Sequence, residues 1–227
     1  MILAIAVALA AAQPAACPDV VTAEAFVCRA IRATADSRHE AAAQAFEQAA
    51  QAIDSSNPEQ SKLWAAAGNS WIAAGQPGKA ALDLDRALAG TGLRAEQRGE
   101  ALLDRARAAE AQNDLKTART KVNEAAQTIS ADPFLWYFSA ALAIREGDAA
   151  TAKSSIGRAL TLAPADPVIL FEAGHVAQFT GDLVGARSYW TRASDLDPKG
   201  DAGAAAREAL RLLPAQVTVQ SEPPPAK

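Results

Sequence analysis

Side chains with reactive or metal-binding chemistry are scarce in this sequence. It contains only 2 cysteines, 2 histidines and 1 methionine among 227 residues. A Cys/His zinc site normally takes four such side chains, and His39 and His175 lie far apart in the chain. No G-x-S-x-G, H-E-x-x-H or C-x-x-C motif occurs, and no pair of carboxylates stands out as buried against apolar neighbours. We therefore expect no catalytic, cofactor-binding or metal site, and a protein that is not an enzyme.

An excess of positive charge is also missing. Lysine and arginine number 22 against 26 aspartates and glutamates, so the formal net charge is -4 and the calculated pI is about 5.3. This balance gives no reason to expect nucleic acid or an anionic membrane surface as a partner. Aromatic residues are few, with 4 Trp, 2 Tyr and 6 Phe, whereas 59 residues are alanine. Such a composition favours closely packed helices over sheet.

The two ends of the chain differ from its body. Residues 1–12 form an uncharged apolar run that resembles a signal peptide and is too short to span a bilayer. We expect an exported, periplasmic protein, with cleavage after the Ala10-Ala11-Ala12 run or as late as residue 16, and a lead over residues 13–22. Residues 214–227 are rich in proline and small polar residues, which predicts a disordered tail.

Cys17 and Cys28 are the two cysteines. In an oxidising compartment they can form a disulfide that closes a small loop and contributes about 2 to 3 kcal/mol, and this is the role we favour. A catalytic thiol would need a neighbouring base or cation, and only Arg29 is near in sequence. Lipidation of Cys17, which would add a membrane as partner, is less favoured because Pro14 occupies a position where a lipobox normally has leucine.

One pattern of small and large residues recurs through the body of the chain. A turn residue is followed by alanine five positions later, a larger residue after nine and alanine after twelve. The turn residues are separated by 38, 38, 34 and 34 positions, and loop insertions around residues 54–57 and 91–94 account for the longer steps. The turn positions are Ser37, Gly75, Asn113, Gly147 and Gly181.

This pattern resembles the tetratricopeptide repeat, a 34-residue helical hairpin. The resemblance covers residues 23–200 and rests on Ala152, Ile156, Ala159 and Pro164, which recur 34 residues later as Ala186, Trp190, Ala193 and Pro198. It implies an all-α fold, a right-handed α-solenoid of about five hairpins over residues 23–213, with a C-terminal capping helix. The predicted units are 23–56, 61–94, 99–132, 133–166 and 167–200, followed by the cap at 201–213.

Local signals mark the ends of the predicted helices. Gly75, Gly147 and Gly181 suit a left-handed residue after a helix, and Asn113 is the next best residue type there. Asp148 and Asp182, which follow two of these glycines, are interpreted as turn residues. Small residues at positions 8 and 20 of a unit let its helices approach, and the larger residue at position 24 is expected to fill the space toward the next unit. Four pairs predict an N-cap followed by a proline in the first helical turn: Asn57-Pro58, Asp132-Pro133, Asp166-Pro167 and Asp197-Pro198.

The resemblance also implies where a partner binds, because family members commonly contact ligands through the first helix of each hairpin. We expect a protein or peptide partner on the concave face and no small-molecule substrate. Large side chains gather in the last two units and can anchor a peptide by burial, although each could instead belong to the core. Lysine and asparagine at the positions of a carboxylate clamp are absent except for Asn69. The candidate contact residues are Lys62, Asn69, Arg107, Phe134, Tyr137, Arg145, Phe171, His175 and Phe179.

Two functions therefore remain open. The first is a non-enzymatic interaction module that holds a peptide or partner protein against the concave face. The second is a structural subunit of a cell-envelope assembly that docks through its convex face or terminal helix.

Overall fold

The computed structural model describes residues 16–213, and in this range it consists of eleven α-helices without a strand. The predicted signal peptide at 1–12 and the predicted tail at 214–227 lie outside the described residues. The helices are α1 Ala23–Ala35, α2 His39–Gln51, α3 Glu59–Ala73, α4 Pro77–Ala89, α5 Ala95–Ala111, α6 Leu115–Ala125, α7 Pro133–Glu146, α8 Ala149–Leu162, α9 Pro167–Phe179, α10 Leu183–Leu196 and α11 Asp201–Leu212.

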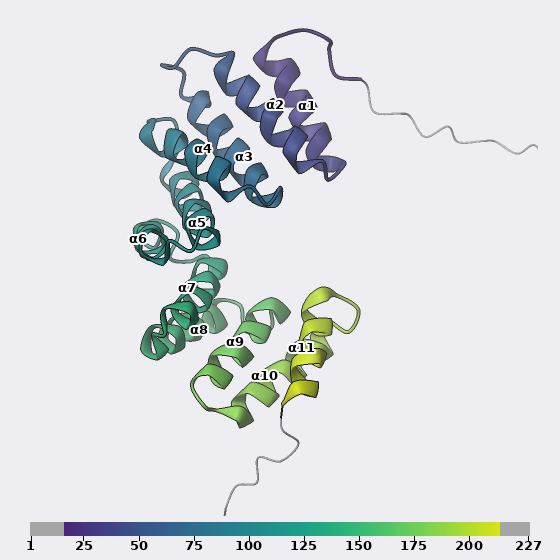
Figure 1. The fold of residues 1–227 in the computed structure, drawn as a ribbon, viewed down its shortest axis with the longest axis vertical. Coiled ribbons are helices and arrows are strands. Elements are labelled where there is room, and N and C mark those ends of the chain that lie inside the picture. Colours follow the sequence, from purple (N-terminus) through teal and green to yellow (C-terminus); the bar gives the residue numbers. More distant parts are fainter. Residues whose placement is uncertain (1–15, 214–227) are drawn as a thin grey trace, which may run out of the picture.

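Successive helices pack as hairpins, and the hairpins follow one another along an arc (Figure 1). The first helices of two neighbouring pairs of hairpins also touch, α3 with α5 and α7 with α9. Within the described residues, the second helices of neighbouring hairpins do not pack on one another in this way. The stack therefore bends so that its first helices lie on the concave side. Helix α11 packs on α10 and α9 at the C-terminal end. The all-helical solenoid expected from the repeat is confirmed.

The hairpin turns carry the left-handed residues that the sequence indicates. Gly75, Gly147 and Gly181 have φ values of 69°, 76° and 82°, and Asn113 has 62°. Ser37, at the same place in the first unit, has a φ of 55°. A single residue in this conformation ends the first helix and lets the chain reverse, which is why glycine or asparagine recurs here.

The N-caps predicted at Asp132 and Asp166 are confirmed. The carboxylates of Asp132 and Asp166 accept from the amides of Phe134 and Val168, each at 2.9 Å. Asn57 also accepts from the amide of Glu59 at 2.9 Å, but α3 begins at Glu59, so Pro58 and not Asn57 occupies the N-cap position. Asp148 and Asp182 do more than form turns, because they accept from Thr151 and Gly185 and so cap α8 and α10.

The helix start predicted at Asp197-Pro198 is wrong. Helix α11 begins at Asp201, while Asp197 ends α10 and turns its carboxylate onto the amides of Gly200 and Gly203, at 2.9 and 3.2 Å. A Cβ added to Gly203 would lie 1.7 Å from the carbonyl oxygen of Asp197. This close approach of backbone to backbone places α11 against the last hairpin and requires glycine there.

The close contact inside a hairpin is made by glycine and a large partner. Leu84 lies against Gly68, and Trp190 lies against Gly174, each on the opposite helix of the same hairpin. The residue at position 24 therefore fills space within its own hairpin as well as beside its neighbours, which corrects the expectation from the repeat pattern. Alanine supplies most of the remaining buried positions, so the helices approach closely over a thin core.

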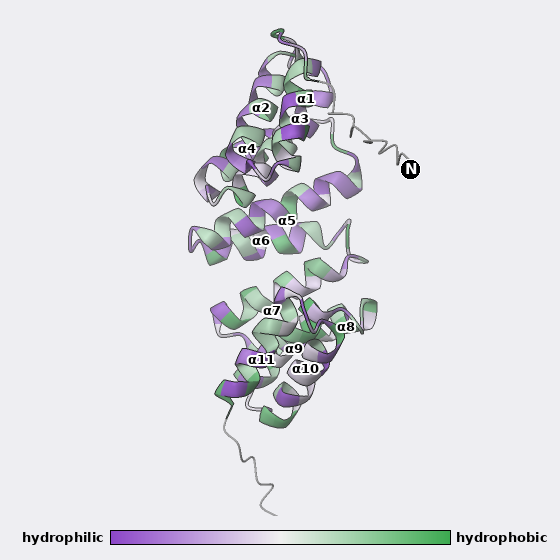
Figure 2. Ribbon diagram, turned by 90° about the vertical axis from the view of Figure 1, so that its right-hand side faces the viewer, coloured by the Kyte–Doolittle hydropathy of each residue, from purple (hydrophilic) through white to green (hydrophobic). Residues whose placement is uncertain are grey.

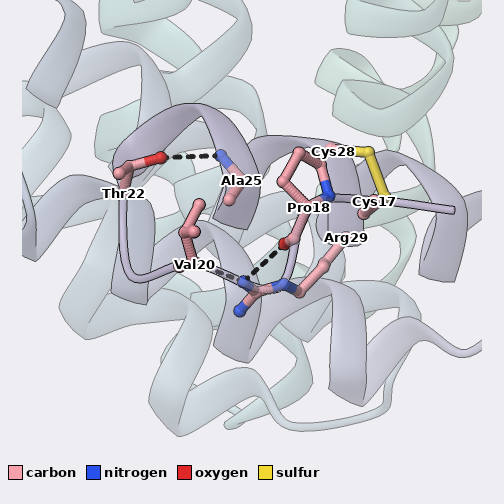
Figure 3. The surroundings of a disulfide bond; sticks show 7 residues. All are labelled: Cys17, Pro18, Val20, Thr22, Ala25, Cys28 and Arg29. Atoms are coloured by element: carbon pink, nitrogen blue, oxygen red, sulfur yellow. Dashed lines mark hydrogen bonds between the residues drawn. A yellow bond between two sulfur atoms is a disulfide. The ribbon is translucent and has the colours of Figure 1, made fainter.

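A covalent link holds the segment that precedes the first hairpin (Figure 3). Cys17 and Cys28 form a disulfide with their Cα atoms 5.7 Å apart. The guanidinium of Arg29 donates to the backbone carbonyls of Pro18, at 3.0 Å, and Val20. The segment 16–22 is thereby fastened against α1 at the N-terminal end of the stack, where no preceding hairpin exists in the described part. Within that part, no helix is long and apolar enough to cross a membrane.

Candidate partner-binding surface

A chain of hydrogen bonds joins α3 to α5 on the side of the first helices. The amide of Asn69 donates to Asp104 at 2.8 Å, and the other oxygen of Asp104 accepts from Arg107 at 2.9 Å. Both Asn69 and Arg107 are exposed, whereas Asp104 is half-buried between them. The structure therefore places these two predicted contact residues in one polar network that faces solvent.

A cavity of about 290 Å³ opens beside this network, between α3 and α5. Its lining combines small and apolar residues, among them Ala65, Ala66 and Leu93, with polar side chains that include Glu100 and Asp104. Lys62, another predicted contact residue, lines it and is held by Glu59 in an ion pair of 2.6 Å. The N-terminal part of the surface thus offers paired charges around a shallow hollow. Figure 2 shows the hydrophilic residues along α5 and the more hydrophobic ribbons of α7 and α9.

Tyr137 connects this polar part to the aromatic part. Its pKa is raised by burial and further by the carboxylate of Glu172 on α9, while Arg107 on α5 opposes the shift. Tyr137 on α7 is therefore near enough to both Arg107 on α5 and Glu172 on α9 for their charges to act on it. Arg107, Tyr137 and Glu172 therefore share the side of the stack formed by the first helices.

The aromatic part begins with Phe134 on the first turn of α7. Its ring meets the ring of Tyr137 edge to face, with centroids 6.4 Å apart. Phe134 is 48% exposed, while Tyr137 is half-buried and packs against the apolar cluster between α7, α8 and α9. Phe134 is thus available to a partner, and Tyr137 supports it from the edge of the core.

A second aromatic group lies on α9. The rings of Phe171 and His175 have centroids 4.4 Å apart, and His175 is 5.6 Å from the ring of the buried Trp190. His175 Nδ1 lies 3.3 Å from the buried carboxylate of Glu172. Phe171 and His175 therefore take part in packing within the hairpin. This agrees with the alternative that individual aromatic residues belong to the core.

The remaining two predicted residues behave differently. Arg145 on α7 donates to the backbone carbonyl and the carboxylate of Glu110 and, at 2.9 Å, to the side chain of Asn113. It fastens α7 to the C-terminal end of α5, so a partner would have to displace these contacts. Phe179, the last residue of α9, is 40% exposed. Two of the predicted aromatic residues, Phe134 and Phe179, are therefore the most accessible.

Two interacting carboxyl groups, the buried Asp83 on α4 and the half-buried Glu47 on α2, contradict the expectation that the chain has no such pair. Asp83 is 1% exposed, and one of its oxygens has no hydrogen-bond donor. Burial raises its pKa to about 7, Glu47 adds to the rise, and Arg86 opposes it. Glu47 also accepts from the indole of Trp71 at 2.7 Å. The available signal was helical spacing, because Asp83 follows Ala80 by three positions and precedes Ala87 by four, on the apolar side of α4.

The described part of the chain contains no cluster of three or more potential metal ligands. His39 begins α2 and His175 lies on α9, so the two histidines belong to different hairpins.

No family model and no curated protein matches the sequence. Solved structures do match it, and three of them illustrate the likeness. YrrB, described as a TPR protein with an unusual peptide-binding site, is 18% identical, with a TM-score of 0.61 over 84% of this chain and 92% of its own. TTC0263, a thermophilic TPR protein of Thermus thermophilus, is 20% identical, with a TM-score of 0.63 over 84% of this chain and 100% of its own.

PilF of Pseudomonas aeruginosa is 15% identical, with a TM-score of 0.66 over 84% of this chain and 83% of its own. These likenesses extend over most of the described helices and reach nearly the full length of the matched chains. Together with the repeat spacing and the hairpin turns, they establish the architecture. The chain has the fold of a tetratricopeptide-repeat solenoid.

Proposed function

We propose that this protein is a non-enzymatic interaction module of the periplasm that binds a segment of a partner protein along its first helices. The observation that carries the proposal is the exposed ring of Phe134, which stands beside Tyr137 on the side shared by α5, α7 and α9. An exposed aromatic ring supported by half-buried neighbours is the arrangement that anchors a peptide by burial.

The surface changes from polar near α5 to aromatic near α7 and α9, and this change supports binding of an extended segment. The hydrogen-bonded charges of Asp104 and Arg107 lie toward the N-terminal part, and the aromatic residues of α7 and α9 follow. A bound segment would therefore place polar groups near α5 and apolar side chains near α7 and α9. The peptide-binding site for which YrrB is described supports the same use of this fold.

The test compares two pairs of exposed apolar residues. Phe134→Ala with Phe179→Ala removes accessible rings from the first helices α7 and α9. Leu82→Ala with Val184→Ala is the matched control, because these residues are 63% and 59% exposed on the second helices α4 and α10. Each protein is tagged, captured from cells after chemical cross-linking, and its cross-linked peptides are mapped by mass spectrometry.

We expect the Phe134/Phe179 variant to lose at least about 90% of the cross-linked partner that the unchanged protein captures, which corresponds to a loss of about 1.4 kcal/mol in binding. Its melting temperature should stay close to that of the parent, because both rings are exposed. Loss of the partner in the Leu82/Val184 variant instead would contradict the proposal and favour a structural subunit that docks through its convex face.

A further inference from the structure

A cavity at the N-terminal end of the stack takes no part in the proposed partner-binding surface. It has a volume of about 500 Å³ and is lined by residues 16–19, α1 and α2. The disulfide residue Cys17 is among the residues that line it. The cavity therefore exists where the fastened lead crosses the outer side of the first hairpin.

Side-chain size explains why this space is open. Ala33 on α1 and Ala41 and Ala45 on α2 line it, and each projects only a methyl group. With 3.6 residues per turn, positions 41 and 45 lie on the side of α2 opposite Ala43 and Glu47, which face α3. In a longer stack this outer side would be covered by another hairpin, whereas here the lead covers it in part.

The walls of the cavity are strongly positive for a protein of net charge -4. Arg29, Arg32 and Arg38 line it, against one lining carboxylate, Asp19. The Arg32 side chain makes no hydrogen bond or ion pair with any residue in the described range. Arg38 pairs with the exposed Asp36 at 3.0 Å. The amide side chains of Gln44 and Gln48 add further donors to the wall.

From this combination we propose that the cavity is a binding site for the phosphate group of a small molecule. Guanidinium groups bind phosphate through pairs of parallel hydrogen bonds and keep their charge at physiological pH. Arg32 supplies a guanidinium that no described residue engages, Arg38 can exchange its exposed pairing with Asp36 for a phosphate, and Arg29 holds the wall in place through the carbonyls of Pro18 and Val20.

The disulfide makes the site conditional on oxidation. Residues 16–19 form one wall, and the bond from Cys17 to Cys28 holds that wall against α1. Reduction would free the lead, so Cys17, Pro18 and Asp19 would no longer enclose the arginines. Phosphate affinity should therefore fall in the reduced protein even though the arginines remain.

Isothermal titration of the purified, oxidised protein with inorganic phosphate and with pyrophosphate tests the proposal, with sodium chloride at equal ionic strength as the blank. Arg32→Gln with Arg38→Gln removes two lining charges. Lys116→Gln with Lys199→Gln removes the same charge from exposed sites on and after other helices and is the matched control. A flotation arm with phosphatidylglycerol vesicles separates a lipid phosphate from a soluble one.

We expect roughly tenfold weaker phosphate binding for each arginine removed, which corresponds to about 1.4 kcal/mol and is near the lower end of what a hydrogen bond to a charged group contributes. The lysine control should retain the parental affinity, and the Cys17→Ser/Cys28→Ser variant should lose it while its circular dichroism stays helical. Binding to vesicles that the arginine variant loses would support the same site with a lipid as the source. Absence of binding to every probe, or equal affinity in the arginine and lysine variants, would overturn the proposal.

Discussion

The carboxyl groups of Glu47 on α2 and Asp83 on α4 interact where both helices pack against α3. Trp71 donates to Glu47 and Arg86 pairs with Asp83 at 3.0 Å, yet one oxygen of Asp83 has no donor. Asp83 is buried and Glu47 is half-buried, and two carboxyl groups this close are stable together when they share a proton. The junction between the first two hairpins therefore contains a group that titrates near neutral pH.

The stability of the protein should depend on pH through Asp83. Its pKa is raised by burial and by Glu47 to about 7 in the folded protein, whereas an unfolded aspartate titrates near about 3.9. Between these two pKa values, the folded protein therefore binds one more proton than the unfolded protein does. The stabilisation is fully present below about pH 4 and is lost as the pH rises through about 7, a change of up to about 4 kcal/mol.

Urea unfolding of the Asp83→Asn variant between pH 4.5 and 8 checks this. The variant should show a flatter dependence on pH and, at pH 8, a larger free energy of unfolding than the parent. Asp85→Asn, on the same helix but with an exposed carboxylate, is the control and should keep the parental slope. Parallel profiles for the parent and Asp83→Asn would show that this group does not titrate near neutrality.

Glycine at position 174 should be required by the ring of Trp190. An added Cβ would lie 2.1 Å from the indole nitrogen, which donates to the carbonyl of Phe171 at 2.9 Å. We expect Gly174→Ala to lower the free energy of unfolding by about 1 to 3 kcal/mol, because a buried ring must move. Gly157→Ala, where nothing lies within 4 Å of the new atom, should instead stabilise α8 by up to about 1 kcal/mol. Thermal unfolding of both variants provides the comparison, and equal effects would contradict the packing argument.

Alanine inside a hairpin should be equally sensitive to size. Ala152 on α8 is completely buried, whereas Ala150, half a turn earlier on the same helix, is exposed. Ala152→Leu should cost about 1 to 3 kcal/mol through overpacking, and Ala150→Leu should change stability by less than about 0.5 kcal/mol. Chemical denaturation measures both, and similar losses at the two positions would indicate that the hairpin is not closely packed.

Loss of the disulfide should act locally. In a stack whose hairpins contact only their neighbours, a change at one end is felt mainly there. The Cys17→Ser/Cys28→Ser variant should lose about 2 to 3 kcal/mol of local stability. Amide hydrogen exchange should therefore become faster in α1 and α2 and remain unchanged in α9, α10 and α11. Faster exchange along the whole chain would show that the link supports the entire array.

The architecture was predictable because it depends on the size of side chains at a regular spacing. Ser37, Gly75, Asn113, Gly147 and Gly181 all occur where a residue must adopt a positive φ, and that requirement is visible in the sequence. The start of the last helix was not predictable from Asp197-Pro198. The same residue pair can begin a helix or bridge two helices, and the choice depends on how closely the backbone of Gly203 approaches.

The candidate surface was predictable only in part. The repeat indicates which helix of each hairpin faces a partner. It does not show which side chains on that helix are already bonded to neighbouring residues. Arg145 is engaged by Glu110 and Asn113, and Tyr137 and Phe171 are half-buried, because contacts between hairpins depend on three-dimensional packing. Asp83 could have been suspected from its spacing among alanines, but its partner Glu47 lies on another helix, 36 positions earlier in the sequence.

Within the described residues, the disulfide-linked segment 16–22 covers part of the first hairpin, and α11 covers the last one. A second copy that continued the array at either end would first have to displace one of these two segments. Helix α11 can detach when its non-covalent contacts break, whereas detachment of the segment 16–22 also requires reduction of the disulfide. Growth from the two ends would thus respond to different chemical conditions.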